Sequence, residues 1–332
     1  MNLLRQVVKY CIKITVLAFL FSFCSCAGIK STQLDIVNEK SNCNQQNEYS
    51  YNENDLPRPY HELDVDSNLK SAFSFKSLNV AHAIGIMEML SEYVSLKQQT
   101  FDETDLRAKI NMIELSQSIN QRINIASLEI SAVASEMDCE EERADQIASY
   151  LQAKEDDAET NLTVAAIIVG AAGAVTAGVL SDGNTAELIG IGTGIAEACL
   201  GLMILLNKRK IEFHHSRNAL QDIWEGKKTS HIFSAPIWYY LNYSNPDVAD
   251  MPSLRDQIIN RWMSFGQIAD ASGKKKDKLI AMYFGAGGKY TAEQLYNRAN
   301  MHDQIEASIN LMKQDLKGLA KELEHFGDNT QY

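Results

Sequence analysis

Two long apolar segments, separated by a short polar turn, lie in the middle of this chain. Residues 162–180 and 186–206 contain almost no charged side chains, and the turn at 181–185 has the sequence SDGNT. Each segment has about the length of a helix that spans a lipid bilayer, roughly 20 residues. The pattern predicts a helical hairpin, which either enters a membrane or packs inside the protein as part of its core.

Small residues recur at every fourth position in both segments, so each series lies on one face of its helix. Small side chains on one face allow two helix backbones to approach closely. We therefore expect these positions to form the contact between the two helices: Ala166, Gly170, Ala174 and Gly178 in the first segment, and Ala186, Gly190, Gly194 and Ala198 in the second.

The first 26 residues have the features of an export signal. Basic residues at positions 5, 9 and 13 precede an apolar stretch at 14–23 that is too short to span a bilayer. The stretch ends in Phe23-Cys24-Ser25-Cys26, which resembles the lipobox of Gram-negative bacterial lipoproteins, although Phe23 replaces the usual leucine. The alternative is an ordinary cleaved signal with incidental cysteines.

The lipoprotein resemblance has consequences for the position of the protein in the cell. It implies that residues 1–25 are removed and that Cys26 becomes the lipid-bearing N-terminus. The protein would then be exported and membrane-anchored, facing the periplasm or the cell surface. No aspartate follows Cys26, and in this class that favours the outer membrane.

Charge inside and beside the hairpin indicates how it would meet a bilayer. Glu197 lies in the second segment, where a lone carboxylate in a membrane costs on the order of 3 kcal/mol unless it is protonated or paired, so Glu197 is a candidate pH-sensitive group. The basic run at 208–210 would lie on the exported side, against the positive-inside tendency. Both features disfavour insertion during synthesis and fit a hairpin that is shielded or inserted later.

Composition excludes some partners and leaves the cysteines open. The chain has 43 acidic and 31 basic residues, a net charge of −12, which argues against a nucleic-acid partner. No spacing typical of a metal site is present, and we predict neither a metal nor a cofactor. Cys43 and Cys139 could form a disulfide in an exported protein, or remain two free thiols.

The remaining sequence predicts an all-α protein, an elongated helical bundle with very long helices. Residues 26–66 are polar and predict a flexible tether, and helical patterns fill 67–160 and 207–332 around the hairpin at 161–206. Residues 104–160 lack proline and glycine and predict one long helix. We also expect helices at 77–99 and 207–226, and a final helix that begins at a Thr291–Gln294 capping box.

This order of a long helix, an apolar hairpin and returning helices is similar to the layout of α-helical pore-forming toxins of the cytolysin A type, without a shared motif. We expect a non-enzymatic, lipid-anchored envelope protein whose hairpin associates with a membrane or a partner. A pore-forming or membrane-inserting protein is the first alternative, and an enzyme with a site assembled by tertiary structure is the second. The lipid bilayer is the expected partner, with a protein partner or a homo-oligomer through the long helices as alternatives.

Overall fold

The chain divides into two units, and the second of them is described here. The computed structural model describes residues 43–44, 48–99, 105–179, 183–206, 208–215, 217–246, 248, 252–268 and 273–328. The first unit, Met1–Ser41, lies outside these ranges, so the export signal and the lipid-bearing Cys26 remain predictions. The second unit, Asn42–Tyr332, is an elongated all-α bundle, which confirms the predicted fold class.

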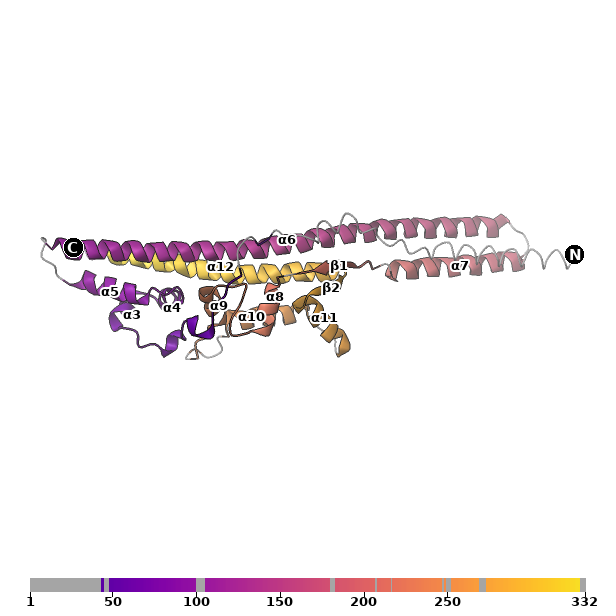
Figure 1. The fold of residues 1–332 in the computed structure, drawn as a ribbon. Helices are drawn as coiled ribbons and strands as arrows, with labels where there is room; N and C mark the ends of the chain where they lie inside the picture. Colours follow the sequence, from indigo (N-terminus) through magenta and orange to yellow (C-terminus); the bar gives the residue numbers. More distant parts are fainter. Residues whose placement is uncertain are drawn as a thin grey trace. The chain divides into compact units, whose positions relative to one another are not determined.

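One helix, α6 (Leu106–Val179), runs through the whole unit and contains 74 residues, a length of about 110 Å. It joins the predicted rod and the first apolar segment without a break (Figure 1). The sequence explains this continuity, because the helix contains no proline and its first glycine is Gly170.

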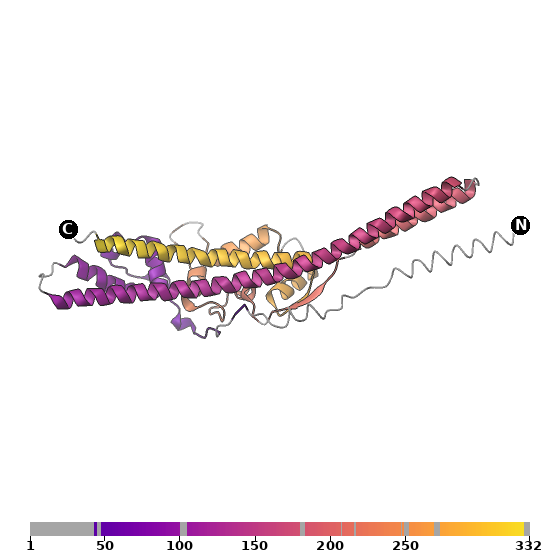
Figure 2. The ribbon, with the colours of Figure 1, turned by 90° about the horizontal axis from the view of Figure 1, so that it is seen from above.

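The second long helix, α12 (Ala292–Asp328), packs along the first half of α6 (Figures 1 and 2). Its start is the predicted capping box: the Thr291 backbone N–H donates to Gln294 Oε1 at 3.0 Å, and the Gln294 N–H donates to Thr291 Oγ1 at 3.3 Å. Fully buried apolar side chains from both helices form the seam: Ile119, Ile130 and Met137 from α6, and Ile305, Ile309 and Met312 from α12.

Short helices pack against this pair and complete the core. They are α3 (Ser67–Ala72), α4 (Phe75–Ala83), α5 (Met87–Gln98), α8 (Ala219–Glu225), α9 (Ala235–Asn242), α10 (Leu254–Ser264) and α11 (Lys274–Phe284), with 3-10 turns η2 (Glu53–Asp55) and η3 (Tyr60–Glu62). The single helix expected at 77–99 is therefore two helices. Gly85, whose φ is +72°, lies between them and adopts a left-handed conformation that interrupts the helical path.

The predicted tether is wrong in its second part, because residues 48–66 pack on the bundle. The Tyr49 N–H donates to the His231 carbonyl at 3.0 Å, and the Tyr51 hydroxyl donates to the Phe233 carbonyl at 3.1 Å. Tyr60 is 7% exposed, and its N–H donates to the Tyr239 hydroxyl at 3.1 Å. The polar composition of this segment predicted flexibility, but three tyrosines supply enough buried contact to order it.

A disulfide fixes the start of this segment to α6. Cys43 and Cys139 are bonded, with 5.4 Å between their Cα atoms and 96 positions between them in the sequence. Of the two alternatives left open by the sequence, the structure contains the disulfide. The link closes a long loop, and a cross-link of this kind restricts the unfolded chain more strongly than the folded one.

Replacing both Cys43 and Cys139 with serine is expected to lower the free energy of unfolding by about 2–4 kcal/mol, because the unfolded chain regains the freedom that the closed loop removes. Urea denaturation followed by circular dichroism measures the loss. Cys199→Ser is the matched control, since Cys199 is a free, half-buried cysteine. Equal urea midpoints for the oxidised parent and the double variant would contradict a stabilising disulfide.

Candidate functional site

The two apolar segments form an antiparallel helical hairpin, hereafter the hairpin (residues 162–206). The end of α6 makes one arm, and α7 (Gly183–Leu206) packs along it as the other. Figure 2 shows both arms extending past the short helices. The predicted contact positions Gly178, Ala186 and Gly190 lie at the tip of the hairpin, outside the residues whose side chains the structure describes.

Large apolar side chains cover the outside of the hairpin. Their exposed fractions range from 50% at Val164 to 66% at Ile167. The set comprises Val164, Ile167 and Ile168 on α6, and Ile191, Ile195 and Leu202 on α7. A buried core hairpin, one alternative from the sequence, does not fit these exposures. Exposed apolar groups concentrated on one structure mark an interaction site more often than scattered single residues do.

The small residues of α6 form part of the contact between the arms. A methyl group at Gly170 would overlap with the carboxyl group of Glu197 on α7, but this group is the end of an exposed, flexible side chain that can move aside. Ala166 is half-buried on the same face, whereas Ala174 is exposed. Gly170 and Ala166 thus lie toward α7, and the packing role of the small residues in the first segment stays a prediction.

The predicted contact face of α7 is wrong among the described positions. Gly194 and Ala198 are exposed, and a methyl group at Gly194 would meet no atom within 4 Å. The inward face instead carries half-buried Thr193 and Ala196 and the buried Leu200. Burying the larger leucine removes more apolar surface from water than burying glycine or alanine, and this rotates the helix away from its stripe of small residues.

Two further observations bear on the membrane prediction. Glu197 is exposed beside the α6 backbone rather than enclosed by apolar side chains, and its pH sensitivity stays a prediction. The sequence predicts two segments of bilayer-spanning length, but no helix among the described residues is both long enough and apolar enough to cross a membrane.

A two-stranded ribbon forms the base of the hairpin. Strand β1 (Ile211–His214) pairs antiparallel with β2 (Gly287–Tyr290), with His214 opposite Gly287. The helix expected at 207–226 is therefore wrong in its first half. Glu212 is exposed and Phe213 is fully buried, and this alternation suits a strand with one buried face.

An acidic run at 155–159 of α6 and the basic run at 208–210 both lie at the base of the hairpin. The Arg209 backbone N–H donates to Glu155 Oε1 at 2.6 Å, which joins the two arms. Lys208 pairs with Glu293 of α12 at 3.3 Å rather than with the acidic run of α6. Both partners of this ion pair are well exposed, so its contribution to stability is small.

Beneath β1 lies a buried polar group of residues, hereafter the base cluster: Arg143, His215, Tyr290, Arg298 and His302. Both guanidinium groups lie over the Phe213 ring, whose centroid is 4.6 Å from Arg143 Cζ and 5.8 Å from Arg298 Cζ. Both distances fall within the range of cation–π attraction.

Further contacts engage the two arginines of the base cluster in part, since the Nε of each has no hydrogen-bond partner within the described part of the chain. Arg143 forms an ion pair with Glu140 at 2.7 Å. Arg298 is fully buried and donates to Asn218 Oδ1 at 3.4 Å and to the Tyr283 carbonyl at 3.3 Å. Buried charge of this kind is tolerated only where hydrogen bonds and ion pairs replace lost water.

Both histidines of the base cluster are neutral at physiological pH. Burial, followed by the charges of Arg298 and Arg143, lowers the pKa of His215 to about 2, although the Gly285 carbonyl opposes the shift. Burial and then Arg298 lower the pKa of His302 well below its usual value. A proton added to either ring would lie in a dry site beside two positive charges.

Sequence patterns did not identify Arg143, Arg298 and His302 as members of one site. A signal for two of them exists in α12, where Arg298 and His302 lie in the buried stripe that also includes Leu295, Ile305 and Ile309. Polar residues at core positions of a long helix are costly, and their presence there indicates a specific tertiary role. Nothing local marks Arg143, since its partners lie on distant segments.

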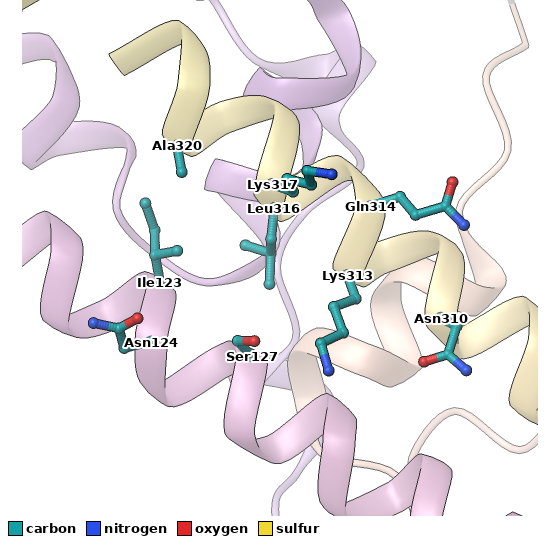
Figure 3. A pocket seen from close by; sticks show the side chains of 9 residues that line it. All are labelled: Ile123, Asn124, Ser127, Asn310, Lys313, Gln314, Leu316, Lys317 and Ala320. Carbon is teal, nitrogen blue, oxygen red and sulfur yellow. The ribbon is translucent and has the colours of Figure 1, made fainter. Parts of the chain in front are cut away.

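Two other features lie on the α6–α12 pair. Carboxylate oxygens of Asp138, Glu141 and Glu306 lie within 4.8 Å of one another. Burial, followed by repulsion from nearby carboxylates that include Asp303, raises the pKa of Glu141 and of Glu306. A pocket of about 460 Å³ lies farther along the pair, and Lys313 and Lys317 are among the residues that line it (Figure 3). Lys313, from α12, donates to Ser131 Oγ of α6 at 2.8 Å.

Comparisons with models of known protein families, with curated proteins and with solved structures find no match.

Proposed function

We propose that this protein is a non-enzymatic, lipid-anchored envelope protein whose hairpin binds a lipid bilayer. The single observation that carries the proposal is the exposure of large apolar side chains on both arms of the hairpin. Transferring apolar surface from water to a hydrocarbon environment is favourable by roughly 25 cal/mol per Å², so such a surface is stabilised when it is covered.

The distribution of the apolar side chains favours a bilayer over a protein groove. Ile191 and Ile195 lie on the outward face of α7, and Val164 and Ile168 lie on the outward face of α6. Each arm therefore presents an apolar face that points away from the other arm. A groove in a partner protein covers one such face, whereas lipid surrounds both.

Charge indicates that the interaction is apolar rather than electrostatic. Residues 155–207 contain no lysine or arginine, and the whole chain carries a net charge of −12. Neither feature supplies attraction to anionic headgroups. Binding is therefore expected on neutral lipids and with little dependence on salt. A lipid chain on Cys26 would add a second membrane signal, since stable anchoring generally takes two.

Ile167→Asp combined with Ile195→Asp is expected to weaken vesicle binding at least 100-fold, because each carboxylate buried in hydrocarbon costs on the order of 3 kcal/mol. The measurement is flotation of the full chain with phosphatidylcholine vesicles. All proteins in the series carry Cys26→Ser, so that no attached lipid contributes.

Leu128→Asp is the matched control for this series. Leu128 is 71% exposed on α6 but lies in the bundle, outside the hairpin. Its substitution should leave flotation unchanged. Background flotation of the parent would overturn the bilayer proposal and leave a protein partner as the occupant. Equal losses in the control and the hairpin variant would place the binding surface elsewhere.

A further inference from the structure

The return strand of the hairpin is attached to the bundle through His215. The His215 backbone N–H donates to the Ala286 carbonyl at 3.3 Å, and His215 Nε2 lies 3.1 Å from the Tyr290 hydroxyl. That hydroxyl donates its proton to the Met282 carbonyl at 2.7 Å. His215 Nε2 is therefore the donor to Tyr290, and a second proton would have to enter on Nδ1.

His302, on α12, is buried near enough to His215, Arg298 and Arg143 for their charges to act on it. It is 1% exposed, and neither of its ring nitrogens has a hydrogen-bond partner within the described part of the chain. A neutral imidazole in such a position behaves mainly as a packing group. A protonated one would bring an unpaired charge into the core, which is far more costly.

Apart from the Gly285 carbonyl beside His215, the groups that face the two histidines do not favour an added positive charge. They are Arg143 and Glu140 from α6, His214 from β1, Tyr283 from α11, Tyr290 from β2 and Arg298 from α12. Glu140 is the one carboxylate among them, and it is already paired with Arg143. Arg298 has no carboxylate partner among these groups, so two further protons would add to a positive charge that is already unbalanced.

We propose that His215 and His302 form an acid-sensitive latch that holds β1, and with it the α7 arm of the hairpin, on the bundle at neutral pH and releases it on acidification. The latch would regulate the hairpin, and this regulatory role rests on the proposed binding of the hairpin to a bilayer. Release would detach one arm while α6 keeps the other in place.

The sign of the pH effect follows from the two states of each histidine. In the latched state the pKa of both rings is depressed, so neither binds a proton near neutrality. In the released state each ring meets water and has a pKa of about 6.5. Acid therefore favours release only below about pH 6.5. Below that pH, each histidine raises the equilibrium constant for release by about tenfold for each unit that the pH falls. At pH 5.0 one histidine raises the equilibrium constant for release about 30-fold, and both together raise it about 1,000-fold.

Hydrogen exchange of the full chain in the absence of lipid tests the latch directly. Rates are divided by the intrinsic exchange rate at each pH, which gives the opening equilibrium of each segment. From pH 7.5 to pH 5.0 we expect opening of residues 208–215 and 287–291 to rise by about 1,000-fold, with little change in residues 119–137 of α6. Because no membrane is present, this result is independent of whether the hairpin binds vesicles.

Three variants make the test specific. His302→Met should reduce the rise to about 30-fold, and His215→Gln with His302→Met should reduce it to a few-fold. His214→Gln is the matched control, because His214 is the exposed neighbour of His215 and its loss should leave the rise intact. If a substitution at His215 unfolds the protein, the wild-type profile and His302→Met still decide. A flat wild-type profile, or a full rise in His302→Met, would overturn the latch.

Discussion

Trp238→Ala is expected to lower the free energy of unfolding by about 3–5 kcal/mol, the range for truncating a large buried aromatic side chain. Trp238 lies on α9 and is 2% exposed. Its ring stacks on Phe233 with 5.6 Å between centroids. Its Nε1–H donates to the carbonyls of Lys227 and Lys228 at 3.1 and 3.2 Å, so the substitution leaves a cavity and two unsatisfied acceptors.

Urea denaturation followed by circular dichroism measures this loss without relying on tryptophan fluorescence. Trp224→Ala is the matched control: Trp224 stacks on Phe284 at 4.6 Å but is only half-buried. Its truncation should cost about half as much, since part of its surface already contacts water. A larger loss for Trp224 than for Trp238 would show that α9 is not central to the core.

Gly287→Ala is expected to cost about 3 kcal/mol and to separate β1 from β2. Gly287 has φ +105°, a conformation that side chains other than glycine rarely adopt. A methyl group there would overlap with the Phe213 carbonyl oxygen and lie 3.0 Å from His214 Cα. Both atoms belong to the backbone of β1, so the strand has to move away to relieve the overlap.

Gly288→Ala is the control from the adjacent position. A methyl group at Gly288 would meet Met282 Cγ at 3.5 Å, an ordinary van der Waals contact. Thermal unfolding should therefore separate the two variants clearly. Hydrogen exchange should show faster exchange at 211–214 in Gly287→Ala alone. If both variants keep the parent stability, the ribbon does not fix the base of the hairpin.

The sequence predicted those features that depend on local pattern. The continuous helix α6 follows from the absence of proline, the hairpin from two apolar runs around a polar turn, and the start of α12 from the capping residues Thr291 and Gln294. Each of these signals lies within the segment that it specifies. Helix formation and capping are decided over a few turns of chain, so a single sequence is sufficient for them.

The features that were missed depend on pairing between distant segments. Strand β1 has four residues, and its partner β2 lies more than 70 positions later, within a stretch that reads as a glycine-rich turn. Residues 211–214 alone give too short a pattern to separate a strand from a helix. The base cluster likewise joins α6, β1, β2 and α12, and only Arg298 and His302 carry a sequence signal of their burial.

The contact face predicted for the α7 arm of the hairpin was wrong for a different reason. Small residues at every fourth position allow a close approach of helices but do not require one. On α6 this approach occurs at Gly170, where the Glu197 carboxyl group fills the space of a side chain. On α7 the burial of Leu200 decides the rotation, and Gly194 remains exposed. Competition between apolar burial and small-residue contact cannot be judged from one helix alone.

The uninterrupted course of α6 gives the two arms of the hairpin different mechanical properties. The start of α12 contacts α6 near Ser149, whose hydroxyl lies 3.1 Å from that of Tyr296. Beyond this point α6 continues to Val179, a distance of about 45 Å. A rotation of α6 by about 5° at Ser149 would displace its far end, at Val179, by about 4 Å. No loop lies between these two residues to absorb the rotation. Torque applied at the tip therefore reaches the bundle along one rigid lever, while the α7 arm ends in a non-helical link that transmits little of it.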